Sequence, residues 1–126
     1  MRKIVMIAVM GVLLVLLVSS VATARTVIQC PNVAGTIICN GTEGRDTLNE
    51  SAGADDIFGF GGRDRIRAGT FSGAADFVDS GRGADRVNTA DGDRLDTVEC
   101  SQGDRIRIDR GDDVDNKKAC DRIIKE

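Results

Sequence analysis

The chain has 126 residues, a formal net charge of −3, four Phe, one Pro, and no His, Trp or Tyr. The lack of His excludes His-based acid–base catalysis and His ligands for zinc. With so few aromatic residues the chain can build only a thin aliphatic core, so we expect crosslinks or metal ions to help stabilise the fold.

The first 24 residues have the layout of a secretory signal peptide. Arg2 and Lys3 precede an apolar run from Ile4 to Val18, and Ala22-Thr23-Ala24 offers small residues for cleavage. We therefore expect residues 1–24 to be removed and the rest to be secreted. The alternative is an uncleaved N-terminal anchor, because the apolar run nearly reaches the length of a membrane span. Cleavage would leave one small domain with a net charge of −5, because both excised charges are basic.

Four cysteines lie in the part expected to be exported, without the C-x2-C spacing of a zinc site. An even number of cysteines in an oxidising compartment indicates two disulfides. Of the three connectivities we favour Cys30–Cys39 and Cys100–Cys120, which would staple the two ends of the domain. Residues 25–40 then form an N-terminal cap segment and residues 116–126 a C-terminal tail.

Residues 41–115 contain a regularly spaced series of eight copies of the pattern Asp-x-(Leu/Ile/Val). Successive aspartates are separated by 9, 9, 12, 9, 11, 8 and 8 positions. Two short insertions, around 70–72 and 94–95, account for the longer steps. The aspartates are Asp46, Asp55, Asp64, Asp76, Asp85, Asp96, Asp104 and Asp112. A period near nine residues that fills the domain indicates a repeat architecture.

Each repeat combines a turn, usually containing Gly, with a very short strand whose apolar residue is flanked by polar ones. Two repeats would form one coil, so that repeats one and three, or two and four, become parallel neighbours about 4.8 Å apart. We therefore expect an all-β parallel β-roll or β-solenoid of about four coils. Its interior would consist of Leu48, Ile57, Ile66, Val78, Val87, Val98, Ile106 and Val114.

The aspartate of each repeat precedes the apolar residue by two positions, so both side chains point inward. Stacking would produce two lines, one of Asp46, Asp64 and Asp85 and one of Asp55, Asp76 and Asp96. Calcium between consecutive turns would remove the repulsion, using carboxylates and the carbonyl oxygens of the glycine turns. The candidate metal-binding residues are these six aspartates with Gly44, Gly53, Gly62 and Gly83. The alternative is that each aspartate accepts hydrogen bonds from its own turn, without metal.

These repeats resemble the hemolysin-type calcium-binding (RTX) nonapeptide, G-G-x-G-x-D-x-U-x, in which U is a large apolar residue. Residues 41–49, 59–67 and 80–88 are the best copies, and the resemblance extends roughly over 41–114. The first or second Gly is replaced in several copies, for example by Thr42 and Phe60, which weakens the match. The resemblance, to the small secreted bacterial type, implies a β-roll whose turns bind Ca²⁺.

The residues beside each apolar position point outward, and their charge follows the repeat number. Even repeats carry acidic residues and two Phe, whereas odd repeats carry Arg45, Arg63, Arg65, Arg67, Arg86, Arg105 and Arg107. A calcium-independent solenoid could use this arginine ladder to bind an anionic polymer or another copy of the chain. The charges could equally serve only solubility. Neither a nucleophile motif nor a free thiol is evident, so we expect no enzymatic activity and no small-molecule substrate.

Overall fold

The computed structural model describes residues 24–31, 35–69 and 73–126. Within these ranges the chain is all-β, with short strands joined by turns and no helix. The expected signal peptide therefore lies outside the described residues, except for Ala24. The expected insertion at 70–72 lies outside them as well.

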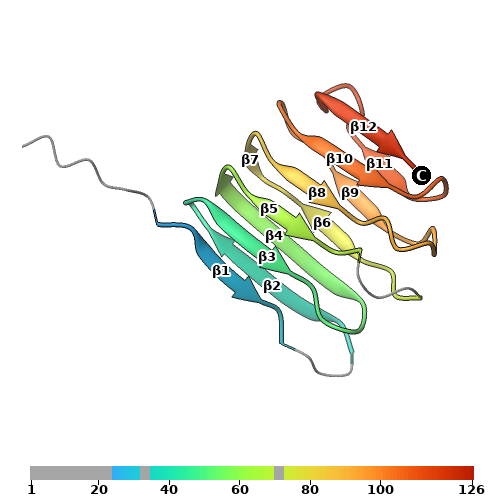
Figure 1. Cartoon of the computed structure of the whole chain (residues 1–126), viewed down its shortest axis with the longest axis horizontal. Coiled ribbons are helices and arrows are strands. Elements are labelled where there is room, and N and C mark those ends of the chain that lie inside the picture. The colour runs from blue at the N-terminus through green and yellow to red at the C-terminus, as the bar shows by residue number, and fades with distance from the viewer. Residues whose placement is uncertain (1–23, 32–34, 70–72) are drawn as a thin grey trace, which may run out of the picture.

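The strands form two parallel sheets that face each other (Figure 1). In order across the sheet, sheet A contains β1 (Thr26–Gln29), β3 (Asp46–Asn49), β5 (Arg65–Arg67), β8 (Arg86–Asn88), β10 (Arg105–Ile108) and β12 (Arg122–Lys125). Sheet B contains β2 (Ile37–Thr42), β4 (Asp55–Gly62), β6 (Phe77–Asp79), β9 (Thr97–Glu99) and β11 (Asp113–Asp115), and β7 (Arg82–Gly83) pairs with the end of β4.

The chain alternates between the sheets, so repeats that are two apart in sequence pair with each other. Leu48 of β3 lies opposite Ile66 of β5, and Ile57 of β4 lies opposite Val78 of β6. All pairings are parallel. The expected β-solenoid, with odd repeats in one sheet and even repeats in the other, is confirmed.

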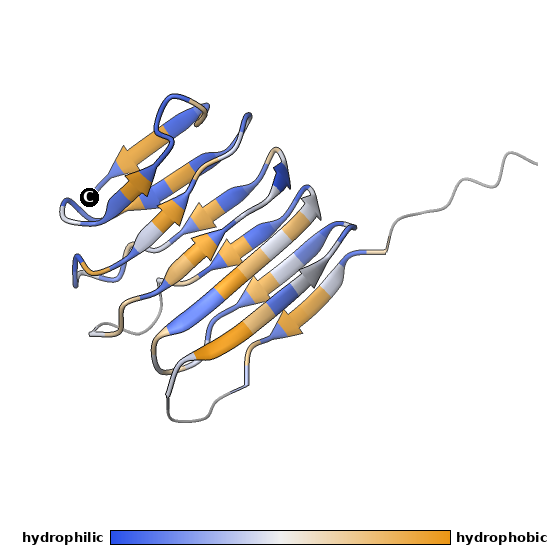
Figure 2. Cartoon of the chain, turned by 180° about the vertical axis from the view of Figure 1, so that it is seen from behind, coloured by the Kyte–Doolittle hydropathy of each residue, from blue (hydrophilic) through white to orange (hydrophobic). Residues whose placement is uncertain are grey.

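The core is a single column of aliphatic side chains between the sheets. Each of the eight apolar residues expected inside is at most 3% exposed. In Figure 2 the hydrophobic colour accordingly forms a band across most strands, between hydrophilic neighbours. This period of two gives each short strand one inward face and one outward face.

The solenoid extends beyond the eight aspartate repeats at both ends, to about five turns. Strand β1 pairs with β3 and places Ile28 opposite Leu48, while β12 pairs with β10 and places Ile123 opposite Ile106. Cys39 of β2 lies opposite Ile57 and occupies the same apolar position. At the N-terminal end, β1 and β2 therefore join the sheets without the aspartate mark, because they supply an apolar residue at the right step. At the C-terminal end, Asp121 precedes Ile123 by two positions and continues the pattern.

Both expected disulfides are confirmed. Cys30 bonds Cys39, with Cα atoms 5.4 Å apart, and Cys100 bonds Cys120, with Cα atoms 5.5 Å apart. The first bridge joins the end of β1 to β2 in the first coil. The second joins the residue after β9 to the segment that leads into β12. The two bridges therefore staple sheet A to sheet B near both ends of the solenoid.

Candidate metal centre in the turns

The eight repeat aspartates are all buried, at no more than 7% exposure. Each lies at the start of a strand or directly before it, two residues ahead of the core residue, so its carboxyl group points into the space between the coils. We call the sheet A set, Asp46, Asp64, Asp85 and Asp104, the first stack. We call the sheet B set, Asp55, Asp76, Asp96 and Asp112, the second stack.

Within each stack, one carboxylate oxygen of every aspartate after the first is used by the neighbouring coil. In the first stack the backbone N–H of Asp46 donates to Oδ1 of Asp64 at 2.8 Å, and the N–H of Asp64 donates to Oδ1 of Asp85 at 2.7 Å. The N–H of Asp85 donates to Oδ1 of Asp104 at 2.9 Å. In the second stack the corresponding N–H to Oδ1 distances are 2.9, 2.9 and 3.4 Å. Carboxyl-to-amide hydrogen bonds thus link successive coils.

The second oxygen, Oδ2, behaves differently at the ends and in the middle of each stack. At the ends the turns satisfy it: Oδ2 of Asp46 accepts from the Thr42 N–H at 2.6 Å, and Oδ2 of Asp104 accepts from the Ser101 N–H at 2.8 Å. In the middle, Oδ2 is buried and has no well-aligned hydrogen-bond partner. These four residues are Asp64, Asp76, Asp85 and Asp96. At the ends the turns thus supply donors to Oδ2, although Oδ1 of Asp46 is also buried without a hydrogen-bond partner.

The same four carboxyl groups have raised pKa values, and the main cause is burial. The pKa is raised to about 6 for Asp64, to about 7 for Asp85, and to about 8 for both Asp76 and Asp96. The hydrogen bond from the neighbouring amide lowers each pKa, while nearby carboxylates raise it. A hydrogen bond with a second carboxyl group also raises the pKa of Asp76, through Glu50, and of Asp85, through Asp104. At neutral pH, Asp76 and Asp96 therefore remain mostly protonated in the absence of metal, whereas Asp64 is mostly ionised.

Because Gly59 and Gly41 have no side chain, a space lined by oxygen atoms remains beside the first stack. A Cβ placed on Gly59 would lie 3.0 Å from Oδ2 of Asp64 and would collide with the Ser80 carbonyl oxygen. A Cβ on Gly41 would lie 3.1 Å from Oδ2 of Asp46 and at 2.8 and 3.2 Å from two carbonyl oxygens. Carboxylate and carbonyl oxygens are the ligands that Ca²⁺ prefers. The donor atoms present therefore fit calcium.

The glycines expected to contribute to the metal sites have a clear conformational role. Gly53, Gly62 and Gly83 have positive φ angles, of 138°, 118° and 142°. A Cβ on Gly62 would overlap the Gly44 carbonyl group, and one on Gly83 would overlap the Gly62 carbonyl group. Gly62 and Gly83 thus let the turns of successive coils approach closely, which brings the stacked aspartates together.

A second acidic group lies in the turn before β9. Single carboxylate oxygens of Asp91, Asp93 and Asp96 all lie within 4.8 Å of one another. Oδ2 of Asp91 and Oδ2 of Asp96 are buried without a hydrogen-bond partner, and burial raises the pKa of Asp91. Asp93 is held in place because its Oδ2 accepts from the Gly73 N–H at 2.7 Å.

Of these three residues, sequence reasoning identified only Asp96 as a candidate metal ligand, because Asp91 and Asp93 lie outside the regular series of repeat aspartates. The signal that could have found this acidic turn is the spacing Asp-Gly-Asp-x-x-Asp from Asp91 to Asp96. This spacing places three carboxylates on one tight turn next to the second stack.

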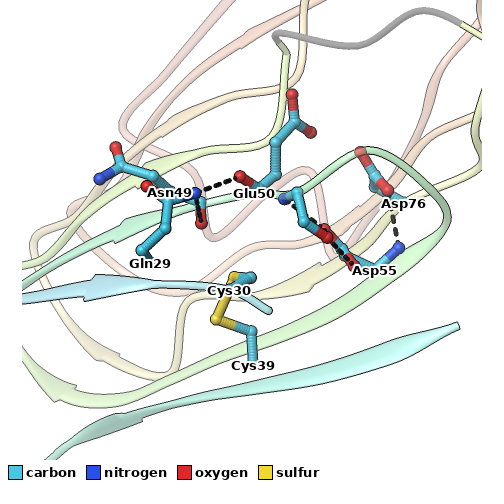
Figure 3. Close-up of a disulfide and its surroundings, with 8 residues drawn as sticks. Gln29, Cys30, Cys39, Asn49, Glu50, Asp55 and Asp76 are labelled. Carbon is cyan, nitrogen blue, oxygen red and sulfur yellow. Dashed lines mark hydrogen bonds between the residues drawn. A yellow bond between two sulfur atoms is a disulfide. The ribbon is translucent and has the colours of Figure 1, made fainter. Parts of the chain in front are cut away.

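The second stack begins close to the N-terminal disulfide. Figure 3 shows the Asp55 amide directed at the Asp76 carboxyl group near the Cys30–Cys39 bridge. Gln29 donates from Nε2 to the Glu50 carbonyl oxygen at 2.8 Å, which connects the end of β1 to the same turn. The disulfide and these bonds hold the first coil against the coil that carries the stack.

No protein family, curated protein or solved structure matches this chain. Among the described residues, no helix is long and apolar enough to cross a membrane.

Proposed function

We propose that this chain is a secreted calcium-binding repeat protein whose turn aspartates bind Ca²⁺ and thereby stabilise the β-solenoid. The observation that carries the proposal is the set of four buried Oδ2 atoms in the middle of the stacks, which have no aligned hydrogen-bond donor. A buried carboxylate oxygen without a partner is costly, and a cation between consecutive coils would remove that cost.

Calcium suits these turns better than a proton or magnesium does. Protons neutralise the four carboxyl groups at low pH, but pKa values of about 6 to 8 leave them partly ionised in a neutral extracellular fluid. Magnesium requires strict octahedral geometry and retains its waters, whereas calcium accepts six to eight oxygens in irregular arrangements. Irregular turns that supply carboxylate and carbonyl oxygens therefore favour calcium.

Residues of both stacks and of the acidic turn would hold the ions. In the first stack these are Asp64 and Asp85, with the carbonyl oxygens near Gly59. In the second stack they are Asp76 and Asp96, the latter next to Asp91 and Asp93. Secretion is supported by the two disulfides, because such bonds persist mainly in oxidising compartments.

Thermal unfolding followed by far-UV circular dichroism tests the proposal. A ligand at about 100 times its dissociation constant stabilises the folded state by about 2.7 kcal/mol. For a domain of this size that corresponds to a rise in Tm of roughly 10–20 °C in calcium relative to chelator. Magnesium at the same concentration is the control and should give a smaller rise. Superimposable unfolding curves in calcium and in chelator would refute the proposal.

A further inference from the structure

The outward side of sheet A is a continuous basic surface. In register across four neighbouring strands, Arg65 lies opposite Arg86, Arg86 opposite Arg105, and Arg105 opposite Arg122. We call the exposed set the arginine face: Arg45, Arg63, Arg65, Arg67, Arg86, Arg105, Arg107 and Arg122. Because neighbouring strands lie about 4.8 Å apart, the arrangement places like charges side by side.

Most of this positive charge is not neutralised within the molecule. In the described part of the chain only two arginines of the face have acidic partners: Arg105 with Asp121 at 3.5 Å, and Arg107 with Glu126. A shallow hollow of about 100 Å³ lies at the N-terminal end of the face. Five arginines line it: Arg25, Arg45, Arg63, Arg65 and Arg86. These arginine side chains point away from the core, so the packing of the core does not require their charge.

The outward side of sheet B carries the opposite charge. Asp79 lies opposite Glu99, and Glu99 lies opposite Asp115, so one column of this sheet is acidic over three neighbouring strands. Two aromatic rings lie beside it, those of Phe58 and Phe77, with centroids 6.0 Å apart. We call this set the acidic face: Asp56, Phe58, Phe77, Asp79, Glu99, Asp113 and Asp115. Of the acidic residues in this face, all in the described part of the chain, only Asp113 has a basic partner, Lys117 at 3.5 Å.

The two faces match each other in spacing as well as in charge. Both belong to one solenoid, so their charged rows advance by the same distance per coil. A row of arginines on one copy can therefore meet a row of carboxylates on a second copy without loss of register. Arg side chains also pack favourably on aromatic rings, and Arg and Phe are both enriched at protein interfaces.

We propose that copies of this chain stack on one another, with the arginine face of one copy against the acidic face of the next. The faces lie on opposite sides of the molecule, so the contact joins two different surfaces. Each copy in a stack still presents one free face of each kind. Such a contact does not close into a dimer but continues as an open assembly. Ionic strength should weaken it, because the interacting charges are exposed before contact.

Three charge-neutralising variants test this arrangement by sedimentation velocity. The arginine variant combines Arg65→Gln, Arg86→Gln and Arg105→Gln. The acidic variant combines Asp79→Asn, Glu99→Gln and Asp115→Asn. The control variant removes three charges outside both faces, one on β7 and two in turns, by Arg82→Gln, Arg110→Gln and Lys118→Gln. Far-UV circular dichroism in calcium verifies that each variant is folded, and every comparison is made in the same calcium buffer.

The expected result is specific to contact between unlike faces. The mass of the unmodified chain and of the control variant should increase with protein concentration at low salt and decrease when salt is added. Each face variant alone should remain monomeric. An equimolar mixture of the two face variants should form a particle of twice the monomer mass and grow no further, because each partner retains only one of the two faces.

Three results would overturn the proposal. The first is an unmodified chain that remains monomeric at low salt. The second is a face variant that assembles like the control variant. The third is a monomeric chain that binds long-chain inorganic polyphosphate and loses that binding in the arginine variant, because the arginine face would then serve an external polyanion. Each result is independent of whether calcium binds, since calcium binding is measured separately by its effect on Tm.

Discussion

Asp64→Asn separates the electrostatic cost of a buried carboxylate from its value as a metal ligand. Oδ1 of Asp64 accepts the Asp46 N–H at 2.8 Å, while Oδ2 is buried without a partner. Asparagine has nearly the same shape and carries no charge. Its Oδ1 can keep the bond to the Asp46 amide, and its Nδ2 faces the space near the Ser80 carbonyl oxygen. The substitution therefore changes charge and ligand strength, with little change in packing.

The expected magnitude follows from the raised pKa of Asp64. Burial raises this pKa from 3.8 to about 6. The folded state therefore binds the proton more tightly than the unfolded state, and the stability this provides is full below pH 3.8 and lost as pH rises through about 6. At about 1.4 kcal/mol per pKa unit, the ionised carboxyl group costs the calcium-free protein at most about 3 kcal/mol. Asp64→Asn should restore up to that amount at about pH 8, and nothing at about pH 4.

Urea unfolding at both pH values, with chelator and with calcium, measures this effect. In chelator at high pH the variant should be more stable than the unmodified chain. In calcium it should be less stable, because the Nδ2 group that replaces Oδ2 cannot coordinate the ion. Asp115→Asn is the matched control, since that carboxyl group is exposed on β11 and should show neither effect. A variant that is less stable than the unmodified chain at high pH in chelator would refute the reasoning.

Three further substitutions probe the coil itself. Gly83→Ala should lower the free energy of unfolding by at least about 1–3 kcal/mol, because φ is +142° and a Cβ would overlap the neighbouring coil. The control is Gly44→Ala, whose Cβ would approach only a hydroxyl oxygen at 3.4 Å. Equal losses of stability for the two variants in urea unfolding would contradict the close-approach argument. Ile57→Ala, at a fully buried position, should cost about 2–5 kcal/mol by the same measurement, and a cost below 1 kcal/mol would show that the core is not tightly packed. Replacing Cys100 and Cys120 together by Ser should lower the free energy of unfolding by about 3 kcal/mol and lower Tm. An unchanged Tm would show that the C-terminal disulfide is not needed for stability.

The architecture could be predicted from the sequence because one signal specifies both register and side-chain direction. The period of about nine residues fixes which strands pair, and the two-residue step from aspartate to apolar residue fixes what lies inside. Leu48 opposite Ile66 and Ile57 opposite Val78 are direct results of that pattern. Strands β1 and β2 lack the aspartate, so they were not predicted as members of the sheets. Strand β12 was not predicted either, although Asp121-Arg122-Ile123 repeats the Asp-x-Ile pattern one coil after Asp104-Arg105-Ile106.

The hydrogen bonding of the carboxyl groups could not be predicted in the same way. Whether Oδ2 of a given aspartate meets a donor depends on local turn conformation, which the spacing does not specify. Thr42 supplies a donor to Asp46, whereas Phe60, at the equivalent position before Asp64, supplies none and has a positive φ of 67°. The acidic turn at 91–96 was missed for the same reason, because its shape depends on an insertion whose conformation the repeat does not define.

Calorimetric titration of calcium into the purified protein near neutral pH, in two buffers of different ionisation enthalpy, tests the central claim most directly. Asp76 and Asp96 have pKa values of about 8 and therefore retain protons at this pH. Calcium binding at these carboxyl groups must displace those protons. The account predicts saturable binding whose apparent enthalpy depends on the buffer. The absence of saturable heat would contradict it, and binding without proton release would show that the ions do not bind at the carboxyl groups of Asp76 and Asp96.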